Sequence, residues 1–197
     1  MIKMAPDSGI SSPGFPAASP ELATFGLKFS SGASHVSRTI MLQELGAMLT
    51  SVPMGSSAAD YREAILQRNV LGKTTDSTRQ KSLRHLRELY ALDEATPIFG
   101  LLRKLHAMDA ASLPLLALQV AWSRDPVFRA TTSAIIDAPE GERVETVSLV
   151  HALEATFPNR YSEMIQNKIG RNTAASWTQP KLCCNWVRDF GASRWQC

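Results

Sequence analysis

Large apolar residues recur three or four residues apart along most of the chain, in segments separated by proline and glycine. This spacing predicts successive helices at about 37–50, 58–69, 75–90, 98–106, 112–123, 126–136, 144–157 and 159–175. The alternation typical of a strand is missing except at residues 140–143, where a short hairpin would fit. The predicted class is therefore all-α, a compact multi-helix fold with one or two helix-turn-helix elements.

Capping residues set several of these predicted boundaries. Ser37 is placed to cap the first helix, and Asp125 with Pro126 forms an N-cap and N1 pair that starts the helix ending near Ile136. Pro158 separates the last two helices and is compatible with the first turn of the second.

Composition shifts predict the domain organisation. Residues 1–27 carry four prolines among serine, glycine and alanine and lack an apolar period, so we expect a disordered tail there. We expect an N-terminal helical domain with a helix-turn-helix at 28–93 and a C-terminal helical domain at 94–179. Residues 180–197 form an atypical tail that holds all three cysteines and two of the four tryptophans.

Basic residues are concentrated in two segments. Residues 68–90 hold six basic and two acidic residues, and residues 160–194 hold six and two again, in a chain whose net charge is only +3. The remainder of the chain is therefore acidic on balance. This segregation is typical of proteins that bind nucleic acid.

The stretch TTDSTRQKSLRHLRELY, residues 74–90, is predicted to be an amphipathic helix capped by Thr75, with Leu83, Leu86, Leu89 and Tyr90 facing the core. Its other side carries cations and uncharged donors. Hydroxyls and backbone N–H groups at a helix N-terminus can hold phosphate, and arginine and glutamine can reach base edges. The predicted DNA-binding residues are Lys73, Thr75, Ser77, Gln80, Lys81, Arg84 and Arg87. A solvated helix face without a ligand is the alternative interpretation.

The stretch at 157–179 has a similar layout, with an apolar face and a polar remainder. Its candidate DNA-binding residues are Arg160, Lys168, Arg171 and Asn172. A second helix-turn-helix fits this pattern, and so does a packing helix that ends in an exposed polar turn.

Other classes of function lack a sequence signal. The four histidines lie on separate predicted elements, and the chain has no glycine-rich phosphate loop and no nucleophile motif, so we expect no catalysis, cofactor or metal. The most apolar run, residues 113–122, is shorter than the ~20 residues of a membrane-spanning helix. A secretion signal is also missing, so we expect a cytoplasmic protein without membrane contact.

Four stretches taken together resemble one known family. They are FSSGAS (29–34), TDSTRQKSLRHLRELYALD (75–93), RDPVFRAT (124–131) and FPNRYSEMIQNKIGRNTAASWTQ (157–179). In this order they are similar to BrxA, the small all-helical component of BREX phage-defence systems, over about residues 26–179. The resemblance implies a non-enzymatic protein that binds double-stranded DNA through helix-turn-helix elements, beside an adenine methyltransferase and the other components of the defence locus.

The chain departs from the family pattern after Gln179. Family members resemble SWTQSGHL at this point and continue with a basic stretch and more helix, whereas this chain continues PKLCCNWVRDFGASRWQC. The abrupt change in composition motivates the hypothesis that a frameshift near residues 179–181 replaced the native C-terminal helices. Resequencing the locus tests this hypothesis, and an uninterrupted reading frame would contradict it.

Two other binding functions are compatible with parts of the sequence. A protein–protein scaffold within the defence complex would suit an all-helical chain, but a scaffold has no need to gather its basic residues into two segments. RNA binding by base stacking is disfavoured, because aromatic residues make up only 7% of the chain and are not interleaved with the basic residues of 74–90. Duplex DNA is the expected ligand, and a monomer is the expected state.

Overall fold

The computed structural model describes residues 18–29, 33–139 and 142–180, and within these residues the fold is all-helical, without a strand. Its longer helices are α2 (Leu42–Ser51), α3 (Ala58–Leu66), α4 (Asp76–Tyr90), α5 (Pro97–Met108), α6 (Leu113–Arg124), α9 (Thr146–Thr156) and α10 (Glu163–Thr178). The shorter elements are α1 (Pro20–Phe25), α7 (Pro126–Ala130), α8 (Thr132–Ile136) and the 3-10 helices η1 (Ser34–Val36) and η2 (Ala110–Ser112). The all-α prediction is confirmed, and residues 142–143 form no strand.

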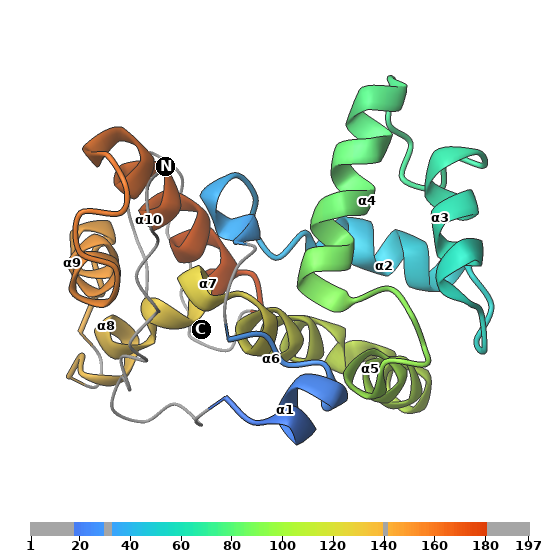
Figure 1. The fold of residues 1–197 in the computed structure, drawn as a ribbon, viewed down its shortest axis with the longest axis horizontal. Helices are drawn as coiled ribbons and strands as arrows, with labels where there is room; N and C mark the ends of the chain where they lie inside the picture. The colour runs from blue at the N-terminus through green and yellow to red at the C-terminus, as the bar shows by residue number, and fades with distance from the viewer. Residues whose placement is uncertain (1–17, 30–32, 140–141, 181–197) are drawn as a thin grey trace, which may run out of the picture.

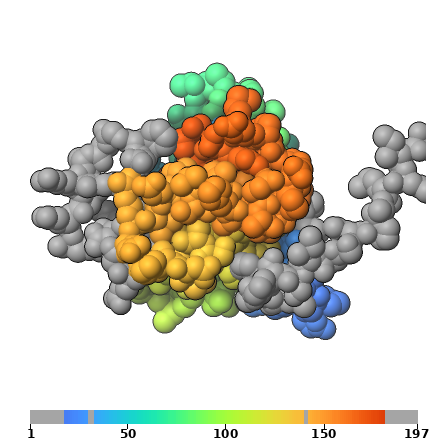
Figure 2. Space-filling view, turned by 90° about the vertical axis from the view of Figure 1, so that its left-hand side faces the viewer, coloured from blue at the N-terminus to red at the C-terminus, as the bar shows by residue number. Residues whose placement is uncertain are grey.

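The helices form two groups on either side of α6 and α7. Figure 1 shows α2, α3 and α4 at one end of the molecule and α8, α9 and α10 at the other. Figure 2 faces this second end, where the residues of α8, α9 and α10 fill the centre of the view. The largest hydrophobic cluster includes Tyr61, Tyr90, Phe99 and Phe128, all of them fully buried. It crosses the domain boundary predicted at residues 93 and 94, because α5 and α6 pack against α2, α3 and α4.

Part of the segment predicted to be disordered is helical. The side chain of Ser19 accepts a hydrogen bond from the backbone N–H of Leu22, Pro20 lies in the first turn of α1, and Gly26 ends the helix with φ of 114°. A helix of six residues is too short to show an apolar period, so the sequence spacing did not predict it. Residues 1–17 and 181–197 lie outside the described residues, so the predictions about both tails are untested there.

The segment before α2 differs from the predicted helix. Ser37 follows η1 instead of capping a long helix, and α2 begins only at Leu42, after Met41 in a left-handed conformation with φ of 52°. Ile40 is fully buried, and its carbonyl oxygen accepts a hydrogen bond from the hydroxyl of Tyr90. Burial of this short segment against α4 outweighs the local helical spacing.

Two further helix boundaries differ from the predictions. The helix predicted at 126–136 is divided at Thr131, whose Oγ1 donates a hydrogen bond to the carbonyl of Phe128 (2.7 Å). Asp125 and Pro126 begin α7 as predicted. Pro158 is not in the first turn of α10, which begins at Glu163, because a six-residue connection intervenes between α9 and α10.

Helices α9 and α10 approach each other closely at Gly170. A Cβ atom built on this glycine would lie 2.8 Å from Cγ2 of Thr146 and 2.9 Å from Cγ2 of Val150. We therefore expect Gly170→Ala to lower the free energy of unfolding by about 1–3 kcal/mol, since either helix must shift to accept the methyl group. Urea denaturation followed by circular dichroism measures this change.

Gly46→Ala provides the matched control for that prediction. Gly46 lies inside α2, and an added Cβ atom would meet only Cδ2 of Leu113, at 3.4 Å. The better helix propensity of alanine then favours a neutral or stabilising effect. Equal destabilisation by both substitutions would contradict close packing at Gly170 as the cause.

Candidate nucleic-acid interface and a buried polar cluster

The connection between α3 and α4 is held in one conformation by side-chain hydrogen bonds to the backbone. The amide of Asn69 donates to the carbonyl of Lys73 (3.0 Å) and accepts from its N–H (2.8 Å). The guanidinium of Arg79 donates to the carbonyl of Leu66 (3.1 Å), and Thr75 caps α4 as predicted. This connection spans residues 67–75, longer than the three or four residues of a typical helix-turn-helix, so that motif stays a prediction.

The two sides of α4 are separated as the sequence predicts. The core stripe of Leu83, Leu86, Leu89 and Tyr90 is buried. The predicted DNA-binding residues that are exposed on α4 and at its N-cap are Thr75, Ser77, Gln80, Lys81, Arg84 and Arg87. Figure 1 shows the N-terminal end of α4 standing clear of the other elements except α3.

A groove of about 270 Å³ lies between α3 and α4. It is lined by Arg62, Leu66, Gln80, Leu83, Arg84 and Arg87, and we call it the α3–α4 groove. The sequence prediction did not include Arg62, because the segment in which basic residues are concentrated begins at residue 68. Its position four residues before Leu66, on one side of α3, was the available signal.

Lys73 is engaged within the protein. Its Nζ lies 3.0 Å from Oε1 of Glu44, and the two side chains are 27% and 25% exposed. A lysine that is paired with a half-buried carboxylate is a poor phosphate ligand, because binding DNA would break the ion pair. Lys73 therefore fits a structural role, joining α2 to the connection before α4, better than the predicted role in DNA binding.

The second group of candidate residues lies on the other side of η1. Figure 1 places α10 and α4 apart, with η1 between them. Arg160 and Lys168 are exposed, and the guanidinium of Arg160 lies 5.1 Å from the ring centre of Phe157. Arg171 is exposed, whereas Asn172 is half-buried and donates its amide to the carbonyl of His35 (2.8 Å). Asn172 thus joins α10 to η1, and the structure does not bring the two predicted groups into one groove.

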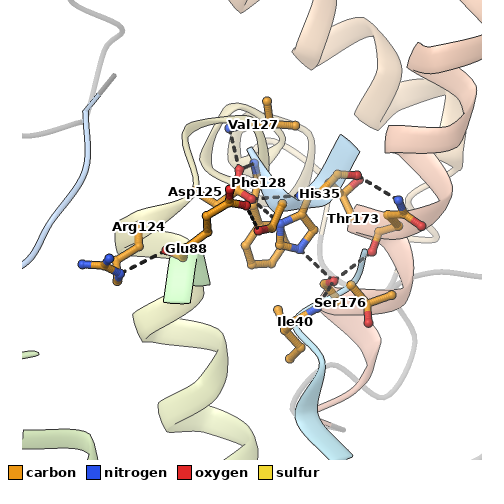
Figure 3. Close-up of polar contacts among 12 residues, drawn as sticks. His35, Ile40, Glu88, Arg124, Asp125, Val127, Phe128, Thr173 and Ser176 are labelled. Atoms are coloured by element: carbon orange, nitrogen blue, oxygen red, sulfur yellow. Dashed lines mark hydrogen bonds and ion pairs between the residues drawn. The ribbon is translucent and has the colours of Figure 1, made fainter. Parts of the chain in front are cut away.

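A buried polar cluster joins η1, α7 and α10. His35 lies between Asp125 and Ser176, as Figure 3 shows. Its Nδ1 is 2.8 Å from Oδ2 of Asp125, and its Nε2 is 2.9 Å from Oγ of Ser176. We call these three residues the His35 cluster. Its members are far apart in the sequence, so no local sequence motif predicts the cluster.

The His35 cluster has the order of a serine–histidine–aspartate triad, but its environment is that of a structural link. His35 and Ser176 are fully buried and Asp125 is 1% exposed. Oγ of Ser176 also accepts from the backbone N–H of Ile40 (3.0 Å) and lies 2.8 Å from the carbonyl of Asn172. A serine enclosed in this way cannot meet a substrate without opening the core, whereas a nucleophile needs access and a neighbouring site for the reacting atom.

Asp125 is the most strongly bonded member of the cluster. Its Oδ1 accepts from the backbone N–H groups of Val127 (3.0 Å) and Phe128 (3.1 Å), and its Oδ2 accepts from the backbone N–H of His35 (3.0 Å). Burial alone would raise the pKa of the Asp125 carboxyl, but its hydrogen bonds and the attraction of His35 outweigh burial and hold the pKa below its usual value.

This lowered pKa predicts an acid-dependent contribution to stability. The Asp125 carboxylate contributes stability above its ordinary pKa of about 3.9, and the contribution is lost as pH falls through the lower pKa of the folded state. An amide cannot titrate, so the stability difference between the natural chain and Asp125→Asn is expected to shrink on going from about pH 7 to about pH 2. Urea denaturation across this range measures it, and a difference independent of pH would contradict the assignment.

Comparison with protein-family models, with curated proteins and with solved structures finds no match. Within the described ranges, no helix is long and apolar enough to cross a membrane. No group of three or more histidine, cysteine or acidic side chains in the same ranges is placed to hold a metal ion.

Proposed function

We propose that this chain binds double-stranded DNA through the α3–α4 groove, as a non-enzymatic component of a BREX-type phage-defence system. The observation that carries the DNA proposal is the gathering of Arg62, Gln80, Arg84 and Arg87 around one groove. These residues come from two helices, and Lys81 extends the exposed basic face of α4. Long cationic donors on a projecting helix suit the phosphates and base edges of a duplex.

The geometry of α4 suits a DNA groove. An α-helix with its side chains is about 10–12 Å across, comparable to the ~12 Å width of the major groove of B-DNA. The two carboxylates of α4 each have a partner within the protein. Asp76, whose side chain is 83% exposed, lies 3.3 Å from the guanidinium of Arg79, and Glu88 accepts a hydrogen bond from Ser34 (2.7 Å). The exposed cations Lys81, Arg84 and Arg87 outnumber these two carboxylates on α4.

The proposal is tested by fluorescence anisotropy with a labelled DNA duplex. We expect Arg84→Ala/Arg87→Ala to weaken binding and to reduce the slope of log affinity against log salt by about two units. Arg160→Ala/Lys168→Ala removes the same charge from the other end of the molecule and is the matched control. A larger loss of affinity in the control would indicate that the interface lies on α10. An unchanged affinity in the groove variant would contradict the proposal.

The role in defence rests on the sequence resemblance and needs a test in cells. A host that carries the defence locus should lose phage resistance when this chain is replaced by Arg84→Ala/Arg87→Ala, because the duplex would no longer be held beside the methyltransferase. Plaque counts measure this resistance. Resistance that persists with a variant shown to have lost DNA binding would separate the defence role from the DNA contact.

A scaffold without DNA contact is the second candidate function. It is favoured by an apolar groove between α5, α6 and α8, because exposed apolar grooves commonly accept partner helices. The two functions differ in salt dependence. Binding to DNA weakens steeply as salt rises, whereas an apolar interface is much less sensitive.

A further inference from the structure

The apolar groove is the larger of the two grooves, with a volume of about 610 Å³. Its lining is almost entirely carbon and includes Phe25, Leu101, Leu105, Ile136 and Trp177. Several of these side chains are solvent-exposed, with Ile136 at 72% and Leu101 at 45%. An exposed apolar surface of this size is typical of a site that binds an apolar partner.

The hydroxyl groups of Thr132 and Ser123 at the groove already have partners. Oγ1 of Thr132 accepts from the indole N–H of Trp122 (2.8 Å) and donates to the carbonyl of Arg129 (2.6 Å). The hydroxyl of Ser123 donates to the carbonyl of Val120 (2.8 Å). These hydroxyls are engaged within the protein, so an occupant is selected by apolar contact and shape.

The C-terminal end of α10 leads directly to this groove. Trp177, in the last turn of α10, lines it, and Pro180 three residues later is buried. The buried Oε1 of Gln179 accepts no hydrogen bond within the described part of the chain. An unpaired buried acceptor is costly, so a donor from the residues that follow would stabilise this end.

The ten residues after Pro180 have the pattern of an amphipathic helix. At 100° per residue, the apolar residues occupy one side and the charged and amide residues the other. The apolar side holds Leu182, Cys183, Trp186, Val187 and Phe190. The polar side holds Lys181, Asn185, Arg188 and Asp189. A helix of ten residues would span about 15 Å.

We propose that residues 181–190 form an amphipathic helix that packs its apolar side into the apolar groove of its own chain. The segment starts at the edge of the groove, its apolar side matches the apolar lining, and its attachment to α10 gives it a high effective concentration there.

Disulfide formation tests the proposal, because all three cysteines lie in residues 181–197. Cys183 is on the apolar side of the proposed helix, and Cys184 is outside it. A thiol is introduced into the groove by Ile136→Cys or, separately, by Leu101→Cys. Each is combined with Cys184→Ser/Cys197→Ser, which leaves Cys183, or with Cys183→Ser/Cys197→Ser, which leaves Cys184. Met164→Cys, on an exposed position of α10 outside the groove, is the control for non-specific oxidation.

We expect mild oxidation to form an intrachain disulfide between Cys183 and at least one groove position, and we expect its loss when Cys184 alone remains. Mass spectrometry of the oxidised full-length chain identifies the bond, and circular dichroism verifies that each variant is folded. Interchain disulfides alone would show that a second copy occupies the groove and would overturn the proposal. The absence of a disulfide at both positions, or equal reaction of both cysteines, would also overturn it.

Discussion

Asp125→Ala is expected to lower the free energy of unfolding by about 3–5 kcal/mol. The substitution removes the carboxylate that bonds His35 and three backbone N–H groups in the core. Both the imidazole of His35 and the first turn of α7 would lose their partners. A buried donor without an acceptor destabilises the fold by its full desolvation free energy, and the substitution leaves several such donors.

Asp109→Ala is the matched control for this prediction. Asp109 also caps a helix, and its Oδ1 accepts from the backbone N–H of Ala111 (2.9 Å), but the residue is exposed. Loss of an exposed cap costs about 1 kcal/mol. Urea denaturation of both variants gives the two values. A loss at Asp125 no larger than that at Asp109 would contradict the role of the His35 cluster as a structural link.

Arg124→Ala is expected to destabilise the fold by about 3 kcal/mol, because a buried guanidinium here satisfies three backbone carbonyls. Its Nε donates to the carbonyl of Glu88 (3.2 Å) and its Nη2 to that of Arg87 (3.4 Å), in the last turn of α4. Its Nη1 donates to the carbonyl of Gly26, after α1. Burial lowers the pKa of Arg124 to about 10, so it stays charged at neutral pH.

Arg62→Ala is expected to weaken DNA binding without destabilising the fold, and it serves as the control. Arg62 is exposed on α3, so its removal should change the free energy of unfolding by less than about 0.5 kcal/mol while weakening duplex binding. Arg124→Ala should destabilise the chain, and at low temperature the folded fraction should still bind DNA. Thermal unfolding and anisotropy, measured on both variants, separate the two effects. If Arg124→Ala weakened DNA binding without destabilising the fold, the structural role assigned to Arg124 would be contradicted.

The elements that sequence analysis predicted well are those with strong local signals. α4 carries a regular apolar stripe and a threonine cap, and Asp125 with Pro126 marks the start of α7. These features act within a few residues, so a single sequence displays them. Boundaries set by tertiary packing were missed. Ile40 is drawn into the core by Tyr90, which lies 50 residues away, and this contact delays the start of α2.

At the candidate site, too, features with a local sequence signal were predicted, and features set by tertiary contacts were not. The exposed face of α4 followed from helical spacing, because alternate sides of one helix can be assigned without knowledge of the fold. The pairing of Lys73 with Glu44, the bond from Asn172 to His35 and the position of Arg62 in the groove each join separate elements. A charge pattern counts basic residues but does not show which of them are already engaged within the protein.

The salt dependence of binding tests most directly whether the α3–α4 groove binds duplex DNA. Anisotropy of a labelled duplex would be measured with the folded natural chain across a series of salt concentrations. If Arg62, Lys81, Arg84 and Arg87 each neutralise a phosphate, log affinity should fall with log salt with a slope of about −3 to −4. Absence of binding at low salt, or binding insensitive to salt, would contradict the claim.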